Sequence, residues 1–113
     1  KANSNKIKIF KSKKIKLIKI KTIKKSKFDL NHILKKIYKL GICHFLLEGG
    51  KDLTEEFLNK ELINQFYLIK SNNILRKNGK ININRILNKL PKTFSSKSIV
   101  NTYVDKDKII RYF

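Results

Sequence analysis

The sequence is poor in residues that cross-link, interrupt or anchor a chain. Its 113 residues include one cysteine, one proline, no tryptophan and no methionine. The single thiol, Cys43, excludes an intrachain disulfide and a cysteine cage for zinc. No apolar run approaches the roughly 20 residues of a membrane span, and the basic start lacks the apolar segment of a secretory signal. We therefore expect a soluble domain of the reducing cytoplasm, with no membrane segment and no metal site.

Acidic residues are also scarce. There are 28 basic and eight acidic residues, which gives a formal net charge of +20. Such a charge favours nucleic acid as a partner, but 25 of the basic residues are lysine and only three are arginine, the better residue for bidentate contacts. Lys, Ile and Asn, whose codons are A/T-rich, make up 55 residues. Two interpretations therefore stay open: a basic nucleic-acid-binding module that uses Lys-rich strands at 6–25, and a solvated lysine-rich surface without a polyanionic partner.

Hydrophobic periodicity predicts the elements of the first half. Lys and Ile alternate from Lys6 to Ile23, which favours one or two half-buried strands with a turn at residues 11–14. A helix is predicted from Phe28 to Gly41, with Asp29 as the N-cap and Gly41 as the left-handed residue that ends it. The short apolar run from Cys43 to Leu47 is typical of a buried strand parallel to an earlier one.

The second half is predicted to continue the alternation of helices and strands. The predicted elements are a helix at 51–60, a strand at 65–69, a short helix or turn at 83–90 stopped by Pro91, and a terminal β-hairpin of 98–104 with 108–112. This order predicts a single α/β domain over residues 1–113 with a mixed sheet.

The segment Glu48-Gly49-Gly50, between a predicted strand and a predicted helix, is the candidate for chemistry. Two glycines let the backbone approach a ligand closely, and a helix N-terminus offers free N–H groups to an anion such as a diphosphate. Glu48 ends the predicted strand, where open α/β sheets place ligands. The alternative is a plain Gly-Gly turn, with Glu48 as a capping or lysine-paired acid.

The segment from Phe28 to Ile69 resembles the reductase domain of the bifunctional riboflavin-biosynthesis deaminase/reductase family (RibD). The resemblance rests on four features: Phe28-Asp29-Leu30 opening a helix, Leu40-Gly41-Ile42 closing it, the run from Phe45 to Gly50, and the run from Leu62 to Leu68. Asn64 and Gln65 stand where family members usually carry Asp-Glu. The chain has about half the length of such a domain, so we expect a C-terminal fragment whose catalytic residues lie in the missing N-terminal half.

The resemblance implies a dihydrofolate-reductase-like fold. It further implies an NADPH-dependent step of riboflavin biosynthesis, in which the ribosyl group of 5-amino-6-(5-phosphoribosylamino)uracil is reduced to ribityl. Gly49 and Gly50 would contact the cofactor phosphates through their backbone, and Glu48 would line the substrate or nicotinamide pocket. The expected partners are the small-molecule substrate and a second copy of the chain.

Overall fold

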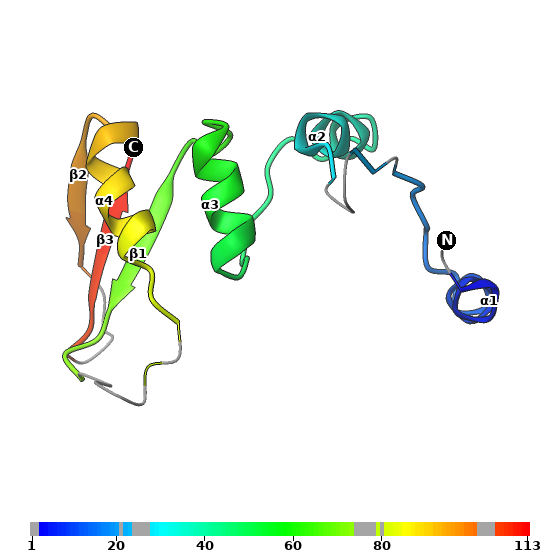
Figure 1. The fold of residues 1–113 in the computed structure, drawn as a ribbon, viewed down its shortest axis with the longest axis horizontal. Coiled ribbons are helices and arrows are strands. Elements are labelled where there is room, and N and C mark those ends of the chain that lie inside the picture. Colours follow the sequence, from blue (N-terminus) through cyan, green and yellow to red (C-terminus); the bar gives the residue numbers. More distant parts are fainter. Residues whose placement is uncertain (1–2, 21, 24–27, 74–78, 80, 102–105) are drawn as a thin grey trace. The chain divides into compact units, whose positions relative to one another are not determined.

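The computed structural model describes residues 3–20, 22–23, 28–73, 79, 81–101 and 106–113. These residues fall into two compact units, Lys1–Phe45 and Leu46–Phe113. Within the described ranges there are four helices and a three-stranded antiparallel sheet (Figure 1). The α/β class is thus confirmed, but the described strands form no parallel pair, so the mixed sheet is not observed.

The first unit begins with a helix, α1 (Ser4–Ser12), where the sequence predicts a strand. The Asn3 side chain accepts hydrogen bonds from the backbone N–H groups of Asn5 and Lys6, and so caps the first turn. The predicted turn at residues 11–14 instead ends this helix: Lys14 has a φ of 57°, and Ile15 N donates to Phe10 O over 2.9 Å.

The strands predicted between Lys6 and Ile23 are therefore wrong for the described residues. Residues 15–20 have no regular structure, and the only β contact described in this unit is an isolated bridge between Thr22 and Phe28. Alternation favours a strand only where a neighbouring strand completes the ladder. A helix makes its backbone hydrogen bonds within the segment itself, and the Asn3 side chain caps its first turn.

The helix α2 (Leu30–Tyr38) confirms the prediction for its region. Asp29 Oδ1 accepts a hydrogen bond from His32 N over 3.1 Å, as expected of an N-cap. After the helix, Gly41 has a φ of 82°, and its N–H donates to Tyr38 O over 2.9 Å. The left-handed backbone conformation at this position favours glycine, because glycine has no Cβ atom.

The strand predicted at Cys43–Leu47 is not formed. Cys43 and Phe45 are exposed, and the Leu46 side chain is 79% exposed. A short apolar run forms a buried strand only between ladder partners, and the described strands pair in the order β1-β3-β2 without this segment.

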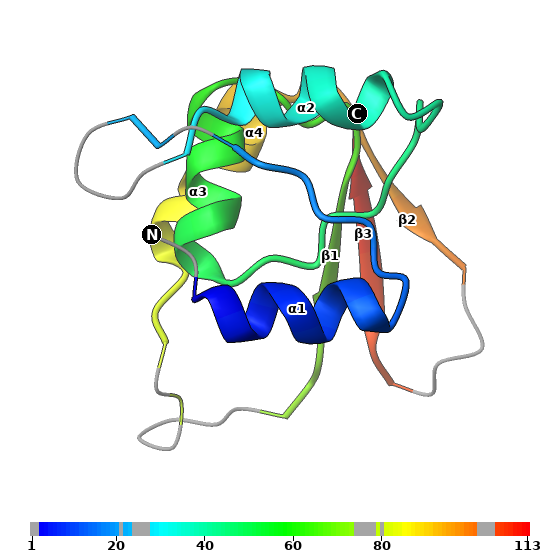
Figure 2. The same cartoon turned by 90° about the vertical axis from the view of Figure 1, so that its right-hand side faces the viewer.

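The second unit contains α3 (Lys51–Asn59), β1 (Phe66–Lys70), α4 (Asn84–Thr93), β2 (Lys97–Val100) and β3 (Lys108–Tyr112). The strand β3 lies between β1 and β2 and is antiparallel to both, as Figure 2 shows. Helix α3, strand β1 and the two hairpin strands confirm the predictions for these regions. The predicted hairpin turn at Asp105-Lys106-Asp107 lies partly outside the described residues.

The core of this unit lies between the two helices and one face of the sheet. Leu58 of α3 and Leu90 of α4 are the largest fully buried side chains, and Ile86 and Phe94 complete the buried cluster. Phe66, Leu68 and Tyr112 pack against it from the strands. Phe66 and Leu68 are two residues apart and Tyr112 is the register partner of Phe66, so all three share one face of the sheet.

Helix α4 runs through Pro91, where the sequence predicts its end. Proline removes one donor from the ladder, but the ladder resumes because Phe94 N donates to Leu90 O over 3.0 Å. Both Leu90 and Phe94 are buried in the core, so tertiary packing holds the last turn in helical form.

Candidate functional site

The Glu48-Gly49-Gly50 segment leads directly into α3, in an irregular stretch that begins after Gly41. Gly50 is the N-cap residue, with φ −68° and ψ 174°, and no side chain caps the helix. Thr54 ties the helix to the turn: its N–H donates to Gly50 O over 3.0 Å, and its hydroxyl donates to Gly49 O over 3.4 Å. The first-turn N–H groups of α3 therefore have no side-chain acceptor from their own cap.

The two glycines differ in what the fold requires of them. A Cβ atom at Gly49 would lie 3.2 Å from Leu53 Cδ2 and 3.3 Å from Leu53 Cβ, which is tighter than ordinary packing. A Cβ atom at Gly50 would meet nothing within 4 Å. Because the backbone of Gly50 is also extended, any residue fits there. Packing explains Gly49, whereas nothing in the described fold explains Gly50.

Glu48 and Gly50 are exposed, and Gly49 is half-buried. The turn thus presents the three predicted site residues in one place, at the surface and at the start of a helix. It does not place them at the end of a strand, as the sequence predicts. Asp52, in the first turn of α3, is also exposed and is the acidic residue at this helix end. Its carboxylate stabilises the helix start and would lie near any anion bound there.

Other polar residues singled out by the sequence lie outside this turn. Gln65 is exposed and its Oε1 accepts a hydrogen bond from the Tyr67 hydroxyl over 3.2 Å. Within the described residues, no group of three or more His, Cys, Asp and Glu side chains is arranged to hold a metal ion. None of the described helices combines the length and the apolar character needed to cross a bilayer.

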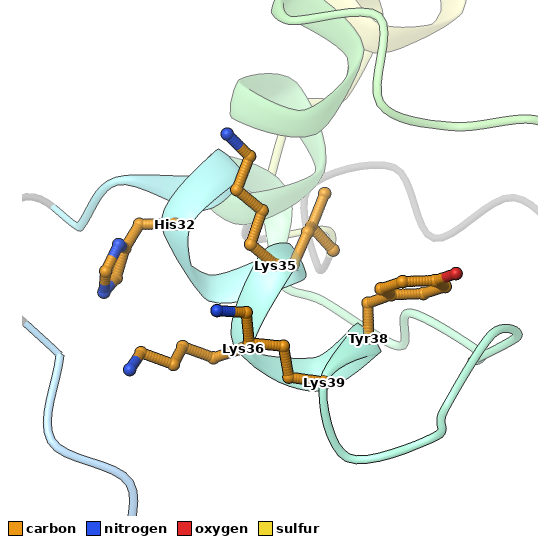
Figure 3. Close-up of a pocket in the computed structure, with 6 residues that line it drawn as sticks. His32, Lys35, Lys36, Tyr38 and Lys39 are labelled. Carbon is orange, nitrogen blue, oxygen red and sulfur yellow. The ribbon is translucent and has the colours of Figure 1, made fainter.

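A second surface feature, which the sequence analysis does not identify, lies along α2. A broad hollow of about 520 Å³ is lined by His32, Leu34, Lys35, Lys36, Tyr38 and Lys39. His32, Lys35, Lys36 and Lys39 have the spacing i, i+3, i+4 and i+7, which puts them on one side of a helix. Figure 3 shows that His32 and Lys36 extend to one side, whereas Tyr38 extends to the other. The spacing of these basic residues is the signal that would have identified the feature.

Comparison with protein-family models, with curated proteins and with solved structures gave no match for this chain. The functional interpretation therefore rests on the residues and on the geometry described above.

Proposed function

We propose that this chain is the C-terminal part of an NADPH-dependent reductase of riboflavin biosynthesis, and that its Gly49-Gly50 turn holds the cofactor diphosphate. The proposal is supported by the order of elements: α2, the glycine at its end, the Glu-Gly-Gly turn, α3 and β1 follow one another as in the family that the sequence resembles, and a terminal hairpin comes after α4. The predicted strand before the turn is the part of that order that the described residues lack.

Gly50 is the single observation that carries the proposal. The fold does not need a glycine at this position, since the backbone is extended and a Cβ would meet open space. A glycine that packing does not explain fits a place where a ligand approaches the backbone. The uncapped N-terminus of α3 supplies the donors and the positive end of the helix dipole that a diphosphate needs.

In this proposal NADPH supplies the hydride that converts the ribosyl group to ribityl. The chain's own part is to bind and to orient. The backbone N–H groups at the start of α3 would hold the diphosphate, and Gly49 would keep the turn close to Leu53 so that the helix start stays in place. The exposed carboxylate of Glu48 would accept hydrogen bonds from hydroxyl or amide groups of the substrate or the nicotinamide.

Calorimetric titration of NADPH into the chain tests this proposal. Near 150 mM NaCl, where the Debye length is about 8 Å, nonspecific attraction to the lysines is weak. We expect one-site binding that is lost in Gly50→Asp, because a carboxylate would face the phosphates. Aspartate is a favoured N-cap residue, so this variant should fold.

The matched control is Asn101→Asp, an exposed position after β2 with the same change in charge. The control should bind NADPH as the parent does. Equal binding by the parent and by a folded Gly50→Asp would contradict the assignment of the turn. A folded parent that binds no NADPH up to about 1 mM, the upper end of common KM values, would contradict cofactor binding by this chain.

A further inference from the structure

The positive charge of the chain is concentrated in its first unit. Residues 1–45 contain 15 of the 25 lysines but only one of the eight acidic residues, Asp29. That carboxylate is already engaged, since it caps α2 by accepting the His32 N–H. The second unit is more balanced, with 13 basic and seven acidic residues. A one-sided distribution of this kind is the electrostatic footprint expected of a polyanion-binding surface.

Within the first unit, the structure gathers basic residues at the hollow along α2. Lys35, Lys36 and Lys39 are exposed, and α2 itself contains no acidic residue. None of these three ammonium groups forms an ion pair with another described residue. Lys39 lies seven positions after His32, which at 1.5 Å per residue is roughly 10 Å along the helix. Along the axis of a stacked strand the phosphates recur about every 3.4 Å, so up to about three could face this stretch.

Tyr38 adds an aromatic surface at the same hollow. Its side chain is 68% exposed and lines the hollow together with Lys35 and Lys39. Figure 3 shows its ring on the side of the helix away from His32 and Lys36. A large aromatic side chain left this exposed beside lysines suits a nucleobase, whose face stacks on the ring while the phosphates meet the ammonium groups. The bases of a duplex offer no free face for such stacking, whereas those of a single strand do.

We infer that α2 binds single-stranded nucleic acid along this hollow, with Lys35, Lys36 and Lys39 contacting phosphates and Tyr38, at the edge of the basic face and three residues after Lys35, stacking on a base. This site differs from the strands at 6–25 on which sequence alone would have placed such binding, because those strands are not formed by the described residues. The inference is independent of the proposed reductase function, since it involves neither Gly50 nor NADPH.

The test is fluorescence anisotropy of labelled oligouridylate and oligothymidylate with the full chain, measured from about 50 to 300 mM NaCl. For single strands the slope of log affinity against log salt is about −0.7 per phosphate contacted. The triple variant Lys35→Gln, Lys36→Gln, Lys39→Gln should therefore bind at least tenfold more weakly at low salt, with a slope about 2 units shallower. Stacking and phosphate contacts do not read the 2′-hydroxyl, so RNA and DNA should bind alike.

The matched control removes the same charge from the same unit: Lys8→Gln, Lys11→Gln, Lys13→Gln. It should lose much less affinity and keep most of the slope. Tyr38→Phe should bind as the parent, and Tyr38→Ala should bind about fivefold or more weakly because base stacking is lost. Equal losses in the two triple variants, or equal binding by Tyr38→Ala and Tyr38→Phe, would overturn the site. Competition by polyglutamate as strong as by the oligonucleotide would assign the surface to acidic polypeptides instead.

Discussion

The ring of Phe94, which ends α4, lies 6.2 Å from the ring of Tyr112 in β3, centroid to centroid, at an interplanar angle of 47°. This tilted pair joins the helix layer to the central strand of the sheet. Phe94 is buried, and it belongs to the cluster with Leu58 and Leu90. Aromatic pairs in this arrangement add to the stability that burial alone provides.

Phe94→Ala should lower the free energy of unfolding by about 3–5 kcal/mol, because it leaves a cavity under the sheet. Phe113→Ala is the control, since Phe113 is 43% exposed and its ring meets the Arg111 guanidinium at 4.6 Å. That variant should lose no more than about 1 kcal/mol. Urea denaturation followed by circular dichroism measures both. A loss at Phe94 as small as that at Phe113 would contradict the described core.

The N-cap of α2 gives a second prediction. Asp29→Ala removes the acceptor of the His32 N–H, so it should cost about 1 kcal/mol of unfolding free energy and reduce the helical signal. Asp29→Asn keeps an acceptor at the same place and should lose only a few tenths of that amount. Circular dichroism during urea denaturation compares the two. Equal effects of alanine and asparagine would show that the hydrogen bond does not support α2.

The two neighbouring glycines should respond to the same substitution with opposite signs. Gly50→Ser adds a capping hydroxyl to α3 in a backbone conformation that suits it, which should raise the unfolding free energy by about 0.5–1 kcal/mol. Gly49→Ser brings Cβ against the Leu53 side chain, which is 42% exposed and must move slightly, so the substitution should lower the unfolding free energy by up to about 1 kcal/mol. Denaturant midpoints of the two variants give the signs directly. A stabilised Gly49→Ser, or a strongly destabilised Gly50→Ser, would reverse the roles assigned to these residues.

Local signals in the sequence predicted the helices that carry their own boundary residues. Asp29 and Gly41 bracket α2, and both act as expected, because capping involves only residues a few positions apart. The hairpin strands are predictable for a similar reason, since a short connection brings them together. The candidate turn is also local, and its three residues lie next to each other in any fold.

The predictions that were wrong concern segments whose structure depends on residues far away in the sequence. Ile15 to Ile20 and Cys43 to Leu47 have the composition of strands, but no described strand pairs with either. Pro91 fails as a stop signal because Leu90 and Phe94, on either side of it, are buried in the core. The hollow along α2 lies outside the predicted features because the predictions for this helix concern only its boundary residues, Asp29 and Gly41.

The position of Pro91 inside α4 gives a prediction about the unfolding free energy that this proline costs. In α4 it leaves the carbonyl four residues earlier, that of Leu87, without its helical donor. Pro91→Ala should restore this hydrogen bond and raise the unfolding free energy by about 1–2 kcal/mol, after allowance for the greater freedom of alanine in the unfolded chain. Lys92→Ala, at the next exposed position, should change it by less than about 0.5 kcal/mol. If Pro91→Ala were neutral or destabilising in urea denaturation, the proline would be supporting the end of the helix rather than straining it, and packing of Phe94 would not be what carries α4 to Thr93.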